Sequence, residues 1–243
     1  MEKQDKEFDL LKNISNEYLN PDKGRQVDQK ILGLVVNEML PWINGPSVLE
    51  MGFGDDQWTS KIIEKIGSTS IVDASEDLLA QAKKKYDNKV QTYSSFFEDF
   101  KPAQKYDTIL ASYILEHVHN PVEVLLQANS WLQPTGKIIA IVPNAGSFHR
   151  HLAVQMGISK SINELGYTDI QMGHRRVYTF EEFERDIEAA DLKIVSSRGL
   201  FVKFLPQNQM TELSDEQLKG FMKLSSVVPK ENCVAIAILC EKK

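Results

Sequence analysis

Two hydrophobic patterns alternate along the chain, one typical of buried strands and the other of amphipathic helices. Short apolar runs predict strands, at Ser47–Leu49, Thr69–Val72, Val90–Tyr93, Tyr106–Ala111 and Lys137–Val142. Apolar residues at helical spacing lie between these runs and predict helices, at residues 57–66, 75–86 and 121–131. This alternation predicts an α/β fold with a doubly wound parallel sheet, whose ligand lies at the carboxyl ends of the strands.

The N-terminal part of the chain predicts further helices over residues 1–45. One apolar face runs through Val27–Trp42, which indicates an amphipathic helix. Residues 1–24 carry apolar side chains at roughly helical spacing. The simplest interpretation of this segment is a helix that docks on one edge of the domain.

The alternation stops between Asn144 and Val177, in a stretch rich in His, Arg, Gly, Gln and Met. Long insertions of this kind are usually functional, so residues 145–178 are expected to form a small substrate cap. Its helices are expected near His149–Met156 and Ile158–Leu165. A helix from Thr179 to Ala190 and two strands then follow, at Leu192–Ser196 and Asn232–Leu239, with a turn expected earlier at Pro134–Gly136.

The turn after the first predicted strand carries the strongest chemical signal. Glu50 precedes Gly52 and Gly54 there, so backbone N–H groups and a helix N-terminus can approach a ligand. Gln57 stands where a dinucleotide fingerprint has its third glycine. A carboxylate before the turn also suits a cofactor with an ammonium group better than one with a pyrophosphate. Asp73 ends the second strand, where nucleotide sites of α/β proteins place the carboxylate that binds a ribose diol.

In order and spacing, these segments resemble the motif series of the class I S-adenosylmethionine-dependent methyltransferases. The match runs from Ser47 to Asn144, more loosely to the C-terminus, and includes Ile114–Val118 and Leu132–Asn144. The resemblance implies one Rossmann-like domain over residues 1–243, with a seven-stranded sheet and an antiparallel last strand. It also implies S-adenosylmethionine as cofactor, S-adenosylhomocysteine as product, and methyl transfer to an oxygen or nitrogen atom.

The same resemblance assigns roles to the residues at the strand ends. Glu50 is expected to face the methionine ammonium, Asp73 the ribose hydroxyls, and Ala111 and Ser112 the sulfonium. The family commonly has an acid at the position of Phe96, so this departure predicts apolar stacking on adenine instead. The full set of expected cofactor-binding residues is Glu50, Gly52, Gly54, Asp73, Ala74, Phe96, Phe97, Ala111 and Ser112.

Three residues are candidates for catalysis: Tyr18, His117 and His149. N-terminal arms often reach the active site in the family that the chain resembles, so Tyr18 is a candidate lid residue as well as part of a docking helix. His117 either packs and orients at the mouth of the site or takes a proton. A general base is required only where the acceptor carries a proton of high pKa.

A basic cluster in the insertion indicates what the acceptor is. Arginine side chains suit phosphate or carboxylate recognition, so the acceptor is expected to be a small anionic metabolite, such as a sugar phosphate or nucleotide sugar. Salt bridges to Glu181 and Glu182 are the structural alternative. A metal site at His149 and His151 is a third interpretation of the cluster. No additional acid or cysteine falls at ligand spacing, so no metal is expected. The candidate substrate-binding residues are Asn144, His149, His174, Arg175, Arg176 and Tyr178.

Gly173–Thr179 and Gly199–Gln207 are similar to segments of methyltransferases that accompany surface-polysaccharide biosynthesis. Two other hypotheses stay open from the sequence. One is a methyltransferase-like module that binds the cofactor but transfers no methyl group and serves as a partner or regulatory subunit. The other is an NAD-binding protein, which the missing third glycine disfavours.

Composition narrows the class of protein. The chain is 42% hydrophobic and 26% charged, with a net charge of −6, which disfavours nucleic acid as the main partner. No apolar window is long enough for a membrane span, and Cys233 and Cys240 lack metal-ligand spacing, so both are expected to be buried thiols. The sequence predicts a cytoplasmic enzyme with a small-molecule acceptor and no membrane or nucleic-acid partner, either monomeric or homodimeric.

Overall fold

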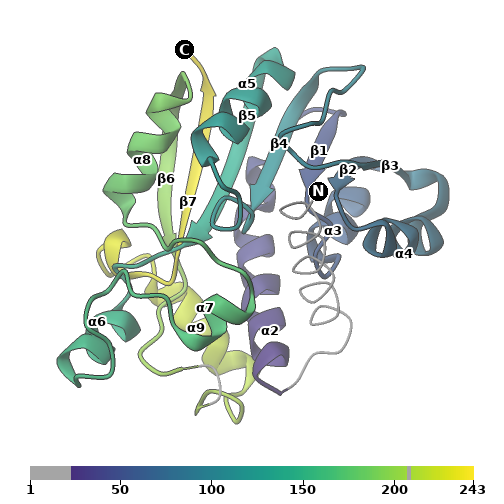
Figure 1. The fold of residues 1–243 in the computed structure, drawn as a ribbon. Coiled ribbons are helices and arrows are strands. Elements are labelled where there is room, and N and C mark those ends of the chain that lie inside the picture. Colours follow the sequence, from purple (N-terminus) through teal and green to yellow (C-terminus); the bar gives the residue numbers. More distant parts are fainter. Residues whose placement is uncertain (1–22, 207–208) are drawn as a thin grey trace, which may run out of the picture.

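The computed structural model describes residues 23–206 and 209–243. Its strands form one seven-stranded sheet in the order β3-β2-β1-β4-β5-β7-β6, with helices on both faces (Figure 1). The predicted α/β, Rossmann-like fold is confirmed. Tyr18 and the docking helix predicted N-terminal to residue 23 lie outside the described residues.

Five strands of the sheet are parallel neighbours, and the last strand runs antiparallel between two others. The strand bounds are β1 Val48–Met51, β2 Thr69–Asp73, β3 Val90–Ser94, β4 Tyr106–Ser112, β5 Leu132–Pro143, β6 Leu192–Leu200 and β7 Ala235–Lys242. The expected turn at Pro134–Gly136 falls inside β5. Its residues occupy a register shift opposite Tyr106 and Thr108, so the strand continues through them as an irregularity.

The helices begin close to where the sequence predicts them because their capping residues are in place. Ser75 accepts a hydrogen bond from the Leu78 N–H, and Thr179 forms a capping box with Glu182. The helix bounds are α2 Lys23–Met39, α3 Gln57–Ile66, α4 Glu76–Tyr86, α5 Pro121–Trp131, α6 Phe148–Gln155, α7 Tyr167–Gln171, α8 Phe180–Ala189 and α9 Asp215–Leu224. The sequence pattern did not predict α9, and a short 3₁₀ turn, Leu40–Trp42, follows α2.

The predicted helix at Ile158–Leu165 is wrong. Gly157 ends the preceding segment at φ +70°, in the left-handed region. Arg150 then donates hydrogen bonds from its guanidinium to the carbonyls of Ile162 and Glu164. Because side chains satisfy this backbone, the segment forms irregular turns, and the helix α7 begins later, at Tyr167.

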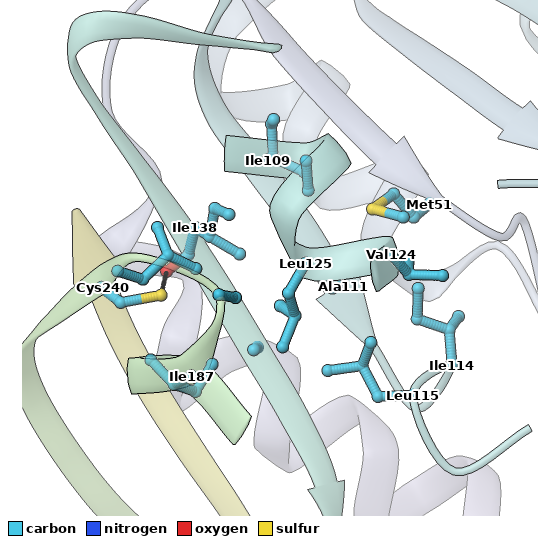
Figure 2. Packing of buried hydrophobic residues seen from close by; sticks show 14 of the residues in the cluster. Met51, Ile109, Ala111, Ile114, Leu115, Val124, Leu125, Ile138, Ile187 and Cys240 are labelled. Carbon is cyan, nitrogen blue, oxygen red and sulfur yellow. Dashed lines mark hydrogen bonds between the residues drawn. The ribbon is translucent and has the colours of Figure 1, made fainter. Parts of the chain in front are cut away.

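Alternate residues of the strands point to opposite faces and make two separate cores. Ile109, Ile138 and Ile238 face α5 and α8, whereas Leu110, Ile139 and Ala237 face α2, α3 and α9. Figure 2 shows the first core, where Val124 and Leu125 of α5 and Ile187 of α8 pack on strand residues such as Met51 and Ile138. Because β1, β2, β4 and β5 pair in parallel, their carboxyl ends lie at one edge of the sheet.

The insertion covers that edge. In Figure 1, α6 and α7 lie beyond the carboxyl ends of β4 and β5. Both cysteines are free and buried, as expected. None of the described helices is long and apolar enough to cross a membrane.

Candidate functional site

Two cavities adjoin at the carboxyl edge of the sheet. The smaller, the strand-end crevice, has a volume of about 170 Å³ and is lined by residues that include Asp73, Ala74, Phe96 and Phe97. The larger, the cap cavity, has a volume of about 430 Å³ and is lined by residues that include Glu50, Glu116, His149, His174 and Lys203. Both are lined by Gly52, Gly54, Ser112, Tyr113 and His117, so the two cavities adjoin at these residues.

The glycine turn after β1 forms the floor shared by the two cavities. Gly52 has φ +81° and Gly54 has φ +55°, a region that L side chains rarely adopt. The Gly52 N–H donates to the Val72 carbonyl at 2.8 Å, which ties the turn to β2. A Cβ built on Gly52 would lie 3.3 Å from Ile114 Cγ2. Glycine at this position therefore allows the strained turn and keeps the floor clear.

Asp73 ends β2 inside the strand-end crevice. Its Oδ2 accepts the Phe53 N–H at 2.9 Å and its Oδ1 accepts the Ser75 N–H at 2.7 Å. Burial raises the pKa of Asp73, and these two hydrogen bonds oppose that shift. An ionised carboxylate has about four lone-pair positions, so both oxygens can still accept hydroxyl groups from a ligand.

Glu50 is almost completely buried on the floor of the cap cavity, where it is 2% exposed. Its Oε2 accepts a hydrogen bond from the Thr59 hydroxyl at 2.6 Å. Burial raises the pKa of Glu50 well above its ordinary value, and the nearby charges of Asp56, Asp55 and Asp73 add to the shift, while the Thr59 bond opposes it. A cationic group bound nearby would stabilise the ionised form.

The comparisons with known proteins identify the family. The family model described as "Methyltransferase domain" matches residues 24–197. The chain belongs to the class I S-adenosylmethionine-dependent methyltransferases. No curated protein matches its sequence.

Solved methyltransferase structures share the fold at low sequence identity. The 1,6-didemethyltoxoflavin-N1-methyltransferase of Burkholderia thailandensis, crystallised with bound 1,6-didemethyltoxoflavin and S-adenosylhomocysteine, is 15% identical with a TM-score of 0.60, over 98% of this chain and 89% of that one. The N-methyltransferase NodS of Bradyrhizobium japonicum, crystallised with S-adenosylhomocysteine, is 11% identical with a TM-score of 0.58, over 96% of both chains. A putative methyltransferase of Bacillus halodurans is 12% identical with a TM-score of 0.61, over 85% and 98%.

The strand-end crevice of this methyltransferase fits the cofactor that the family uses. Gly52 leaves open a floor that a Cβ would narrow, and Asp73 presents oxygens suited to the ribose hydroxyls. Phe96 and Phe97 line the same crevice, where adenine is expected. Ser112 lies on both cavities and accepts a hydrogen bond from the Trp58 indole at 3.0 Å.

Ala111 is the one predicted cofactor residue whose side chain is placed elsewhere. It is 1% exposed and belongs to the core that packs on α5 and α8, and it lines neither cavity. The reason is the alternation of β4: Ser112 ends the strand at the cavities, so the residue before it points into the core. Ser112 is therefore the residue of this pair that can meet a ligand.

The two arginines that the sequence predicts as substrate ligands bind the protein's own backbone instead. Arg176 donates to the carbonyls of Leu115, Val118 and His119, at 2.8, 2.6 and 3.0 Å. Arg175 donates from its Nε to the His117 carbonyl at 2.7 Å. Neither arginine lines the cavities. The structural alternative, salt bridges to Glu181 and Glu182, is not seen among the described residues, where Glu181 pairs with Arg185 and Glu182 caps α8 through Thr179.

Tyr178 and Asn144 are also engaged within the protein. The Tyr178 hydroxyl donates to Asp186 at 3.0 Å, and its ring is buried in the core. Asn144 lines the cap cavity, but its amide N–H groups donate to the carbonyls of Glu231 and Cys233. Because an amide has two such donors, its side chain has none left for a substrate.

His149 and His174 do line the cap cavity. Burial lowers the pKa of His149 to about 3, helped by the charges of Lys203 and Arg150, so the ring is neutral at pH 7. Its buried Nδ1 has no hydrogen-bond partner within the part of the chain that is described. His174 is held by Asp169, whose Oδ1 lies 3.1 Å from the His174 Nδ1.

The cavity also contains residues that the sequence analysis did not assign to the site. Lys203 is only 3% exposed, and burial lowers its pKa to about 8. Glu116 is fully buried, which raises its pKa to about 7. The available signal for Lys203 was a charged residue inside the apolar run Phe201–Leu205. Glu116 belongs to the motif Ile114–Val118, in which the sequence analysis considered only His117.

Proposed function

We propose that this methyltransferase transfers a methyl group to an oxygen or nitrogen of a small acceptor bound in the cap cavity. The observation that carries the proposal is that Gly52, Ser112 and His117 line both cavities, which therefore adjoin there. A nucleoside at Asp73 and a methionine group near Glu50 would bring the sulfonium to that junction. S-adenosylmethionine supplies an activated methyl group when bound, so the protein contributes mainly by positioning the acceptor.

The volume of the cap cavity favours a compact acceptor. The cavity measures about 430 Å³, near the lower end of the range for small-molecule sites. Its floor at Glu50 and Gly52 is also where the methionine part of the cofactor is expected. A single-ring metabolite fits the remaining space better than a complete nucleotide sugar does.

The acceptor is proposed to carry an acidic group that Lys203 binds. Arg175 and Arg176 donate to backbone carbonyls and line neither cavity. Lys203 supplies a buried positive charge on the cavity wall instead. A bound anion would restore the usual preference of this amine for the charged form, because it offsets the cost of burial.

His149 is proposed to take the proton of a hydroxyl or ammonium acceptor. Its ring lines the cap cavity and is neutral at pH 7, and its buried Nδ1 has no hydrogen-bond partner within the described structure. The ionised group of the acceptor would raise the pKa of His149 and so make it a better base. His117 remains a candidate for orienting the acceptor at the junction.

The test is release of S-adenosylhomocysteine with a panel of single-ring acceptors, each in a phosphorylated and an uncharged form. Lys203→Met is expected to raise the KM of the phosphorylated acceptor at least tenfold, with the Kd of S-adenosylhomocysteine unchanged. Lys160→Met changes an exposed lysine of the insertion and serves as the control.

Preference for uncharged acceptors, together with an unaltered KM in Lys203→Met, would refute the anionic acceptor. Tight binding of S-adenosylhomocysteine without turnover of any acceptor would instead favour the inactive partner module. The two outcomes are therefore separable in one set of measurements.

A further inference from the structure

Three potential metal ligands meet on the wall of the cap cavity: Glu116, His117 and His174. Each offers one ligand atom, and these atoms all lie within 4.8 Å of one another. Glu116 and His117 come from the β4–α5 loop, whereas His174 comes from the end of the insertion. The Arg175 N–H donates to the Glu116 carbonyl at 2.8 Å, which holds the two segments side by side.

The Glu116 carboxyl group is buried near His174 and Arg176 without a hydrogen bond to either of them. It is 0% exposed, and neither of its oxygens makes a hydrogen bond within the described part of the chain. Leaving such a group unpaired is costly, and buried carboxylates are normally hydrogen-bonded, paired with a charge, or bound to a metal. Glu116 lines the cap cavity, so a small cation could reach it there.

Both histidines are oriented in the way that metal-binding histidines usually are. The His174 Nδ1 lies 3.1 Å from Asp169 Oδ1, which leaves its Nε2 for another ligand. Asp169 is itself fixed by the Arg150 guanidinium at 2.6 Å and the Gly166 N–H at 2.8 Å. The backbone of Gly173 and Met172 lies next to the His117 ring. A carboxylate or carbonyl behind each imidazole fixes the tautomer and directs the other nitrogen to a metal.

The geometry points to a divalent transition-metal site formed by Glu116, His117 and His174, with zinc as the ion that this ligand set suits best. Two imidazoles and one carboxylate are typical of zinc and related ions, whereas calcium and magnesium prefer oxygen ligands throughout. Zinc–ligand bonds are about 2.0 to 2.2 Å long, so the three side chains would close in around the ion. The inference goes beyond the proposed function, since metal binding does not depend on methyl transfer.

Three protein ligands leave at least one coordination position open. His117 lines both cavities, and Glu116 and His174 line the cap cavity, so that position faces the space proposed for the acceptor. A hydroxyl bound there would have a lower pKa and would lose its proton more readily. The metal and His149 would then approach the acceptor from neighbouring walls of the same cavity.

The test is a titration of the chelator-treated, untagged chain with Co²⁺, whose visible absorption reports coordination by protein ligands. We expect one saturable site, and a Kd at least tenfold weaker in Glu116→Gln and in His174→Gln. Asp169→Asn removes the carboxylate behind His174 and is expected to weaken binding 10- to 100-fold, as changes behind a ligand typically do. Competition with Zn²⁺ should bleach the cobalt spectrum.

His151→Gln is the matched control, because His151 is exposed and lies outside the three-residue cluster. Its Kd is expected to equal that of the unmodified chain. Circular dichroism and thermal unfolding of the metal-free variants establish that they fold. The inference is overturned if the unmodified chain shows no saturable site, if folded Glu116→Gln and His174→Gln bind Co²⁺ as tightly as it does, or if His151→Gln abolishes binding. None of these outcomes requires an active methyltransferase.

Discussion

Replacing Asp73 by asparagine tests the cofactor site most directly, because the structure defines both oxygens of this side chain. Each accepts one backbone N–H, from Phe53 and from Ser75. An asparagine keeps one oxygen and turns an NH₂ group toward the other N–H. That leaves a buried donor unpaired, which costs about 1 to 3 kcal/mol of folding free energy.

The same substitution should weaken cofactor binding more than it weakens folding. The carboxylate is expected to accept two ribose hydroxyls, and hydrogen bonds to a charged group contribute about 1.5 to 3 kcal/mol each. With asparagine, one of these two hydrogen bonds would be lost, and the other would be weaker because its acceptor is no longer charged. We expect a loss of about 3 kcal/mol, which is roughly a 150-fold increase in the Kd of S-adenosylhomocysteine.

Isothermal titration calorimetry with S-adenosylhomocysteine measures that Kd, and thermal unfolding measures the folding cost separately. Asp77→Asn is the matched control, because this substitution removes the same charge from an exposed residue in the first turn of α4. Its Kd should stay within about twofold of the unmodified chain. If folded Asp73→Asn also bound within twofold, Asp73 would not contact the ribose, and the assignment of the strand-end crevice would be wrong.

Three further predictions follow from other parts of the site. Arg176→Met should lower the free energy of unfolding by about 3 kcal/mol in urea denaturation, since three carbonyls lose a charged donor. The control, Arg185→Met, replaces an exposed arginine and should change the free energy of unfolding by less than about 0.5 kcal/mol. Equal effects of the two substitutions would contradict the structural role of Arg176. Gly52→Ala should destabilise the chain by about 1 to 2 kcal/mol and weaken S-adenosylhomocysteine binding, because φ is +81° there, whereas Gly220→Ala on an open helix surface should be neutral or stabilising. For His149, the folded pKa of about 3 lies below the ordinary 6.5 because of burial, so the unfolded state binds more protons and stability falls as the pH drops below 6.5. Between pH 7 and pH 4.5 the unmodified chain should lose about 3 kcal/mol more than His149→Gln in urea titrations, and parallel curves would refute the buried neutral ring.

The sequence predicts most of the fold because local patterns and tertiary structure agree over the first half of the chain. The predicted helices at residues 57–66 and 121–131 have the observed bounds of α3 and α5. Both begin at clear signals, the glycine turn and the Asn120–Pro121 cap. Asp73 could be placed in the same way, since a strand end is visible in the apolar pattern and an acid there has few structural alternatives.

The insertion was harder to predict because its contacts are long-range. Nothing local shows that Arg150 satisfies the carbonyls of Ile162 and Glu164, so the helical pattern of Ile158–Leu165 was misleading. The same holds for the basic residues: a guanidinium can bind a phosphate or a carbonyl, and the sequence does not distinguish them. Lys203 and Glu116 became candidates only when the fold placed them on the cavity wall.

Arg175 and Arg176 have a structural role at the candidate site. Residues 173–178 lie against the β4–α5 loop, and Arg175 and Arg176 donate to carbonyls of Leu115, His117, Val118 and His119. That loop carries Tyr113, Glu116 and His117, which line the cavities. Residues 173–178 therefore hold the backbone of the β4–α5 loop in place through the two arginines, while the His174 side chain lines the cap cavity itself. Because one short segment performs both tasks, a change of acceptor in related chains would require coordinated changes in the cap and in the β4–α5 loop.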